Sequence, residues 1–196
     1  MTSTSDKKGE PVVLHGKREE LYYFAYGSDM NTKQIQERCS SPKAIGVAKL
    51  PDYRIAFFGE TKIWDSGLET VLEDPGHNVW GVIYALSSAD RQGLDLWQDA
   101  RLDGAGANFH YPVVLTDTEG VTRTVLLYKK DRTDQPQLPS QEYLDFIAEG
   151  AAEHNLPAEY IEELRTMASK KARYPVPHRK KGAEFLMLHS CTDCEG

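Results

Sequence analysis

Short apolar runs separated by turn residues recur along this chain and predict a β-sheet. The first run, residues 21–26, is aromatic and unbroken, which is typical of a buried strand. Later runs are joined by Pro51-Asp52, by Asp74-Pro-Gly76 and by Glu119-Gly120, and such turn residues favour antiparallel hairpins. Strands are therefore expected at residues 21–26, 44–50, 53–58, 67–73, 79–86, 110–116 and 121–130.

Capping residues that precede amphipathic segments predict four helices. Asn31 is followed by Gln34 at capping-box spacing, and Ser140 precedes apolar positions that share one helical face. The helices are expected at residues 31–39, from the caps at 87–90 to about 100, at 140–154, and from a break at 155–157 to about 167. Because strands and helices do not strictly alternate, an α+β fold is favoured over a doubly wound sheet.

The two ends of the chain differ in composition from its middle. Residues 1–19 are polar, which predicts a disordered or loosely attached arm. Residues 170–196 form a proline-containing tail that carries six Lys or Arg and no acid up to Lys181. One folded domain of ordinary size is expected between them, at residues 20–169.

Composition and charge limit the classes of partner. The 196 residues include 40% apolar residues, enough for a substantial core, and the net charge is −7. An acidic balance argues against a nucleic acid or an anionic membrane as a general partner. No apolar run reaches the ~18–20 residues that span a bilayer, and the N-terminus lacks the apolar region of a secretory signal. Three cysteines, an odd number, favour a cytoplasmic protein without a disulfide framework.

Several well-known catalytic and cofactor motifs do not match. The run Tyr26-Gly-Ser-Asp-Met30 lacks the flanking glycines of a serine nucleophile elbow. Gly104-Ala-Gly106 continues neither as a dinucleotide-binding motif nor as a P-loop. Cys191 and Cys194 lie near His189, but a structural zinc site needs four ligands and the second pair is missing. No metal ion or other cofactor is therefore expected.

One candidate site is the junction at Tyr26-Gly-Ser-Asp29, where the first strand leads into a helix. Backbone N–H groups exposed at such a junction can bind an oxyanion or a carboxylate. The alternative is a plain tight turn in which Gly27 supplies an unusual backbone angle.

Residues 22–30, Tyr-Tyr-Phe-Ala-Tyr-Gly-Ser-Asp-Met, resemble the FAYGSN signature of the γ-glutamylcyclotransferase-like family. Residues 64–70 (WDSGLET) and 74–82 (DPGHNVWGV) resemble the next two elements of that family in the same order. Later tyrosines also match, so that the resemblance spans roughly residues 21–168. The fold it implies is a small, mostly antiparallel β-barrel or curled sheet with surrounding helices.

The resemblance implies cleavage of a small γ-glutamyl amide by its own α-amine. The amine adds to the γ-carbonyl, which yields 5-oxoproline and releases an amine or amino acid without a metal, a nucleotide or a covalent enzyme intermediate. Such a reaction needs a carboxylate that moves protons and backbone donors that stabilise the carbonyl oxygen. It also needs a pocket that holds the glutamyl chain folded for ring closure.

The resemblance also implies which residues bind the substrate. Residues 23–28 would form the turn that binds the glutamyl group, and three later tyrosines would line the pocket with rings and hydroxyls. The expected binding residues are Tyr23, Phe24, Ala25, Tyr26, Gly27, Ser28, Tyr111, Tyr128 and Tyr143. Because no Arg or Lys cluster falls inside the motifs, backbone N–H groups and tyrosine hydroxyls would hold the substrate carboxylate. For each tyrosine, the alternative is a core aromatic.

The sequence departs from the family pattern at the catalytic base. The family's usual Glu stands three residues after the Leu94-Asp95 pair, where this chain has Gln98. A shift of one residue makes Asp99 the acid/base, with Asp103 as the alternative. Asp95, Asp99 and Asp103 would share one face for as long as the helix lasts.

A second departure lies in the turn, where Asp29 replaces the family's usual Asn and adds a negative charge. Three functions remain open at this point. The first is cyclotransfer on a γ-glutamyl amide, and the second is a specialised relative that acts on a γ-glutamyl-amine in a biosynthetic pathway. The third is a non-catalytic ligand-binding module that has lost the base. The residues indicate neither the leaving amine nor the oligomeric state.

Overall fold

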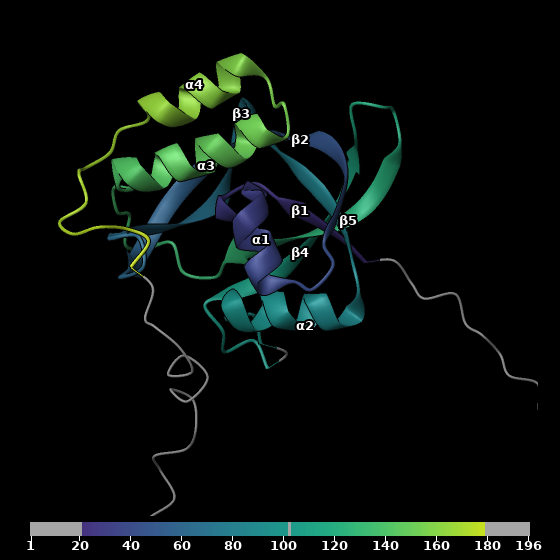
Figure 1. Ribbon diagram of the computed structural model, residues 1–196, viewed down its shortest axis with the longest axis horizontal. Coiled ribbons are helices and arrows are strands. Elements are labelled where there is room, and N and C mark those ends of the chain that lie inside the picture. Colours follow the sequence, from purple (N-terminus) through teal and green to yellow (C-terminus); the bar gives the residue numbers. More distant parts are fainter. Residues whose placement is uncertain (1–20, 102, 179–196) are drawn as a thin grey trace, which may run out of the picture.

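A computed structural model describes residues 21–101 and 103–178 of the chain. One five-stranded sheet has the strand order β2-β3-β1-β5-β4 and is covered by helices (Figure 1). The strands are β1 (Leu21–Ala25), β2 (Lys43–Thr61), β3 (Ser66–Leu86), β4 (Asn108–Thr116) and β5 (Thr122–Lys130). The helices are η1 (Ser28–Met30, 3-10), α1 (Thr32–Arg38), α2 (Ser88–Trp97), α3 (Gln141–Glu153) and α4 (Ala158–Thr166). This arrangement confirms the predicted α+β fold.

The sheet is mostly antiparallel and open rather than a closed barrel. Central strand β1 pairs antiparallel with β3 and parallel with β5, while the β2–β3 and β4–β5 pairs are antiparallel. The two edges approach each other at one point, where Ala48 of β2 forms an isolated bridge with Asp117 after β4. The N–H of Thr118 also donates to the carbonyl of Val47, at 2.8 Å. Of the two shapes expected, the curled sheet is therefore the one formed.

Four of the strands expected from the sequence merge into two long ones, β2 and β3. Pro51-Asp52 was expected to be a turn, but the pairing continues across it, from Pro51 opposite Asn78 to Tyr53 opposite Glu73. Asp52 has a φ of 60°, and its carboxylate accepts a hydrogen bond from the N–H of Gly76 at 2.9 Å. An irregularity in the ladder therefore absorbs the turn residues without reversing the chain.

The core lies between β1 and the helices that flank it. Phe24 and Ala25 of β1 are fully buried, as are Leu144 and Ile147 of α3. Helices α3 and α4 pack together on one side of the sheet, and α2 lies at the opposite end (Figure 1). Gly150 permits close approach of α3 to η1, because a Cβ there would lie 2.5 Å from the backbone nitrogen of Asn31. The segment that follows β1 is thus held firmly against α3.

Helix α2 ends earlier than the sequence predicts. Its last residue is Trp97 and Gln98 is its C-cap, whereas the helix was expected to continue to about 100. Asp99 follows with a φ of 45°, in the left-handed region, which no helix can continue through. Asp99 and Asp103 therefore lie beyond the helix and do not share a helical face with Asp95.

The chain continues past α4 in contact with the rest of the fold. The N–H of Lys170 donates to the carbonyl of Pro139, and the N–H of His178 donates to the carbonyl of Ile63. Arg173 pairs with the buried carboxylate of Asp65 at 2.6 Å. The predicted arm at 1–19 and the Cys191/Cys194 pair fall outside the described residues.

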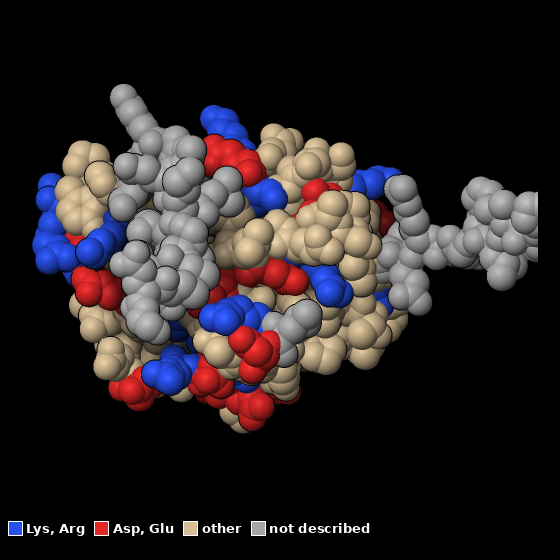
Figure 2. All heavy atoms as spheres, turned by 90° about the horizontal axis from the view of Figure 1, so that it is seen from below, with Lys and Arg blue, Asp and Glu red and all other residues tan. Residues whose placement is uncertain are grey.

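Acidic and basic side chains are interspersed on the face of the molecule that carries α2 (Figure 2). Within the described part of the chain, no helix has the length and apolar character needed to cross a membrane.

Candidate active site

A cavity of about 120 Å³ opens beside the turn formed by residues 26–28. Its walls come from η1, α1, the two long strands and the loop between them, the segment after α2, and α3. The lining includes Ser28, Arg38, Trp64, Glu69, Gln98, Asp99 and Tyr143. A second cavity of about 470 Å³ adjoins it and shares Asp99 and Ala107. Lys130 and Arg132 line this second cavity.

Gly27 lets a carboxylate approach the turn closely. Its φ of −121° is not left-handed, so an unusual φ is not the reason for glycine here. A Cβ at position 27 would instead lie 2.4 Å from Oε1 of Glu69 and 2.5 Å from its Cγ. Any other residue would collide with Glu69, which explains the glycine by close packing.

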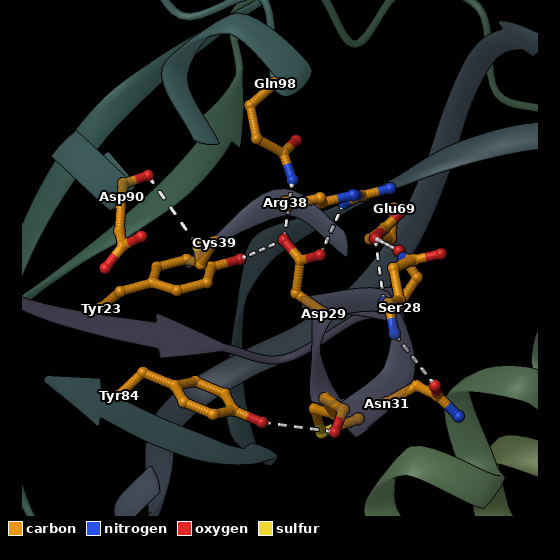
Figure 3. Close-up of polar contacts among 12 residues, drawn as sticks. Tyr23, Ser28, Asp29, Asn31, Arg38, Cys39, Glu69, Tyr84, Asp90 and Gln98 are labelled. Atoms are coloured by element: carbon orange, nitrogen blue, oxygen red, sulfur yellow. Dashed lines mark hydrogen bonds and ion pairs between the residues drawn. The ribbon is translucent and has the colours of Figure 1, made fainter. Parts of the chain in front are cut away.

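Glu69 of β3 is bound to the turn by donors from two elements (Figure 3). Its Oε1 lies 3.1 Å from the backbone nitrogen of Ser28 and 3.2 Å from the Ser28 hydroxyl. Its Oε2 accepts a hydrogen bond from the hydroxyl of Tyr143 on α3. Burial, together with the Glu69 charge, raises the pKa of Tyr143 well above its usual value, so that this hydroxyl keeps its proton and donates it.

Asp29 is buried beneath the turn and accepts three hydrogen bonds (Figure 3). Its donors are the Tyr23 hydroxyl at 2.9 Å, Nη1 of Arg38 at 2.5 Å and Nε2 of Gln98 at 3.2 Å. The Arg38 guanidinium also lies over the ring of Trp97, 5.0 Å from the ring centroid. Arg38 thereby forms one wall of the cavity, with a positive charge that the sequence motifs did not indicate.

The residues after α2 take different positions around the cavity. Asp99 is exposed and lines both cavities, and its Oδ2 accepts from the N–H of Ala107 at 2.9 Å. Asp103 is exposed and forms an ion pair with Arg101 at 2.9 Å. The N–H of Ala105 lowers the pKa of Asp103, and this carboxylate lies outside the lining of both cavities.

The residues expected to bind substrate take four kinds of position. Ser28 and Tyr143 line the cavity, together with the expected acid/base Asp99. Phe24, Ala25 and Tyr26 are buried in the core, with the Tyr26 hydroxyl donating to the carbonyl of Tyr128. Tyr23 supports the site from below through Asp29, while Gly27 makes room for Glu69.

The other two expected tyrosines lie outside the cavity lining. The hydroxyl of Tyr128 donates to Asp95 at 2.6 Å, and its ring lies beside that of His110 on the neighbouring strand β4. The hydroxyl of Tyr111 on β4 lies 3.2 Å from that of Tyr53 on β2. This contact joins the two edge strands of the curled sheet. The structure therefore brings together one of the three expected lining tyrosines with the turn.

Comparison with known proteins places the chain among its relatives. The AIG2-like family matches residues 78–164. Curated γ-glutamylcyclotransferases from Bos taurus and Homo sapiens are 30% and 31% identical to it, over 76% of this chain and 79% of each relative. The chain belongs to the γ-glutamylcyclotransferase family.

Solved structures agree with this membership. A structure of a γ-glutamyl cyclotransferase matches with a TM-score of 0.74 at 28% identity, over 87% of this chain and 98% of that one. An ensemble-refined crystal structure of an uncharacterized human protein matches with a TM-score of 0.73 at 27% identity and the same coverage. The family membership expected from the sequence is thus confirmed.

Two charged residues of the cavity lining, Glu69 and Arg38, were not expected from the sequence. Glu69 lies inside the matched segment at 64–70, and its alternation along β3 was the available signal for a side chain facing the turn. Arg38 ends α1, which begins directly after the turn, so its position near the site could have been anticipated from the helix length. Among the described residues, no three His, Cys, Asp or Glu side chains are grouped so as to hold a metal ion.

Proposed function

We propose that this protein is a γ-glutamylcyclotransferase that converts a γ-glutamyl amide into 5-oxoproline and a free amine or amino acid. The observation that carries the proposal is the cavity at the 26–28 turn. There a backbone N–H group, a tyrosine hydroxyl, a guanidinium and carboxylates face one small space. The family membership supports the same reaction.

Each group on a γ-glutamyl substrate has a counterpart in the cavity. Arg38 supplies a positive charge for the α-carboxylate, since the guanidinium has five N–H donors and Asp29 engages one of its nitrogens. The Ser28 N–H and the Tyr143 hydroxyl, which donate to Glu69, would become donors for the γ-carbonyl oxygen when the substrate displaces that carboxylate from the turn. The ring of Trp64 gives the methylene chain an apolar wall.

Proton transfer requires a carboxylate near the reacting nitrogens. The sequence hypothesis assigns this role to Asp99, which lines the boundary between the two cavities. The contacts at the turn add Glu69 as a second candidate. The leaving amine would extend into the larger cavity, whose wall includes Lys130 and Arg132.

The proposed location is the cytoplasm. The reaction needs no oxidising compartment, and the buried Cys39 is a free thiol, as is usual for proteins of reducing compartments.

One observation favours a second candidate function, a non-catalytic module that binds γ-glutamyl compounds. Gln98 occupies the family's usual base position and donates its amide N–H to Asp29, so it does not accept a proton there. Such a module would keep the cavity and lose the reaction.

Incubation with γ-glutamyl-alanine and with a γ-glutamyl-amine, followed by assay of 5-oxoproline, separates these functions. The proposal predicts 5-oxoproline together with an equal amount of released alanine or amine. Product from the γ-glutamyl-amine alone would identify the specialised relative. If neither compound gives product although both raise the melting temperature, the protein is the binding module and the proposed function is wrong.

A further inference from the structure

The proposed reaction needs one carboxylate that can reach both the α-amine and the leaving nitrogen of the substrate. Three acidic residues and one amide lie at or below the cavity, namely Asp29, Glu69, Asp99 and Gln98. Their contacts differ, and these differences select one of them.

Asp29 and Gln98 are bound to each other below the cavity. Asp29 is 2% exposed and accepts from three donors, including the Arg38 guanidinium. Asp29 lies below the cavity and is not part of its lining, so it supports the site without facing the space for the substrate. A glutamate at position 98 would bring a second carboxylate to the place where Gln98 now donates 3.2 Å from Asp29. Asp29 therefore favours an amide at the usual base position.

Asp99 lies on the loop that follows α2 and lines both cavities. Its side chain is exposed, and its Oδ2 is held by the N–H of Ala107 on the same loop. An exposed carboxylate at the boundary of the two cavities is placed to contact the outer part of a substrate.

Glu69 is the carboxylate that contacts the turn itself (Figure 3). Oε1 lies within 3.2 Å of both the backbone nitrogen and the hydroxyl of Ser28, and Oε2 accepts from Tyr143. Gly27 is shaped to this contact, because a side chain at that position would overlap the Glu69 carboxylate. These donors hold the Glu69 carboxylate at the turn, which is where the glutamyl group of the substrate is expected to bind.

We propose that Glu69 is the general acid/base of this family member and takes over the role that Gln98 cannot perform; this assignment rests on the proposed function. Glu69 accepts a proton from the substrate α-ammonium, and the freed amine forms a bond to the γ-carbonyl carbon. The bond from that carbon to the leaving nitrogen then breaks as Glu69 returns the proton to it. After the ring has closed, Glu69 takes the second proton of the reacting nitrogen and passes it to the released amine. The reacting nitrogen thus loses two protons and the leaving nitrogen gains two, so no water, oxidant or cofactor enters the balance.

The test compares Glu69→Gln with Asp99→Asn and with Glu73→Gln, an exposed glutamate on the same strand that serves as the matched control. The kinetics of 5-oxoproline formation and the melting temperature are measured for each. Glu69→Gln should lower kcat by about 100-fold or more, with KM within about threefold of wild type, because general acid/base catalysis contributes ~10²–10⁴-fold. Asp99→Asn should lower kcat by less than tenfold, and Glu73→Gln should match wild type.

Two further readouts separate catalysis from folding. The acidic limb of the pH profile of kcat/KM should disappear in Glu69→Gln, because that limb reports the ionisation of the base in the free enzyme. Glu69→Asp keeps a carboxylate at the turn and should retain at least ten times the activity of Glu69→Gln. Equal losses in these two variants would contradict a role in proton transfer.

The assignment is overturned if Glu69→Gln keeps more than a tenth of the wild-type kcat, or if Asp99→Asn shows the larger loss. The first result would leave the proposed function intact as long as wild type forms 5-oxoproline. Absence of product from wild type with every γ-glutamyl compound is a different outcome, and it would contradict the proposed function itself.

Discussion

Residues 29 and 98 form a charge exchange relative to the pattern that the family signature implies. The resemblance places Asp29 where the family pattern has Asn and Gln98 where it has Glu, and the two side chains are hydrogen-bonded at 3.2 Å. Asp29 also pairs with Arg38 at 2.5 Å. Because the two positions together carry one negative charge in either arrangement, the effects of substitutions at 29 and 98 are not expected to add.

The buried pair makes a prediction about stability. Replacing Asp29 by Ala leaves the Arg38 guanidinium, whose side chain is 12% exposed, without its partner. The free energy of unfolding should fall by about 3–5 kcal/mol, the usual cost of breaking a buried ion pair from one side. Urea unfolding measures this loss.

Two variants control that measurement. Asp29→Asn should cost less than Asp29→Ala, because an amide oxygen still accepts from Tyr23. Asp103→Ala removes one partner of an exposed ion pair and should leave stability almost unchanged. A loss in Asp29→Ala no larger than in Asp103→Ala would show that the pair does not stabilise the site.

At the scale of elements, one hydroxyl joins the start of α3 to the loop between β2 and β3. Ser140 caps α3 by accepting from the N–H of Tyr143 at 3.3 Å, and it donates to the carbonyl of Trp64 at 2.7 Å. The rings of Trp64 and Tyr143 stack with centroids 4.5 Å apart. Two walls of the cavity therefore depend on the position of this cap.

Ser140→Ala should affect both stability and substrate binding. Losing a helix cap and leaving the buried carbonyl of Trp64 without its donor should lower the free energy of unfolding by about 1–3 kcal/mol. Because Trp64 and Tyr143 line the cavity, KM should also rise several-fold. Ser88→Ala, at an exposed position in the first turn of α2, is the control and should change neither quantity. An unchanged KM in Ser140→Ala would mean that the cap does not position the cavity walls.

At the scale of the whole molecule, the segment after α4 returns to the loop between the long strands. Lys170 bonds to the residues before α3, His178 bonds to Ile63, and Arg173 pairs with Asp65. We propose that the folded domain includes residues 170–178, beyond the limit at 169 that composition suggests.

Truncation tests this domain limit. A chain that ends at residue 169 should melt about 6 °C or more below a chain that ends at residue 178, because it loses three backbone hydrogen bonds worth about 1 kcal/mol each. The difference in melting temperature is read by circular dichroism. Equal melting temperatures would place the limit at 169.

The Asp65–Arg173 pair predicts an acid dependence of stability. Hydrogen bonds from Arg173 lower the pKa of Asp65 to about 2. In the unfolded chain the value is about 3.9, so the pair stabilises the fold above pH ~4, and this contribution is lost as the pH falls toward ~2. Asp65→Asn tolerates the left-handed φ of 48° and removes the charge.

Urea unfolding of wild type and Asp65→Asn at pH 6, 4 and 3 checks this dependence. The variant should be less stable at pH 6, and the gap should narrow as the pH is lowered. A gap that stays constant with pH would show that the ionised Asp65 does not contribute.

Much of the fold was predictable from local signals. The caps at Asn31, Ser87 and Ser140 all accept the expected backbone N–H hydrogen bonds, because capping is a contact within one helical turn. The course of the chain at Pro51-Asp52 was not predictable locally. Its turn residues are absorbed by pairing with β3, whose residues lie 20 or more positions away. The early end of α2 likewise depends on Asp99, which contacts Ala107 of the following loop.

The site was predictable only in part, for a related reason. Ser28 and Tyr143 were found because each lies in a motif with a recognisable sequence. Glu69 also lies in a segment that resembles a family element, but the sequence does not show which group its carboxylate contacts. Its contact with Ser28 joins positions 41 residues apart and exists only once β3 lies beside the turn. The position of Arg38 in the cavity also depends on the folded chain, because it follows from the direction of α1.

In the proposed reaction the α-amine of the substrate, and not water, cleaves the γ-glutamyl bond. Reaction of γ-glutamyl-alanine in H₂¹⁸O with mass analysis of the products distinguishes the two. Cyclisation incorporates no oxygen from water, so we expect unlabelled 5-oxoproline and free alanine in equal amounts. Glutamate carrying ¹⁸O would show hydrolysis and would rule out cyclotransfer.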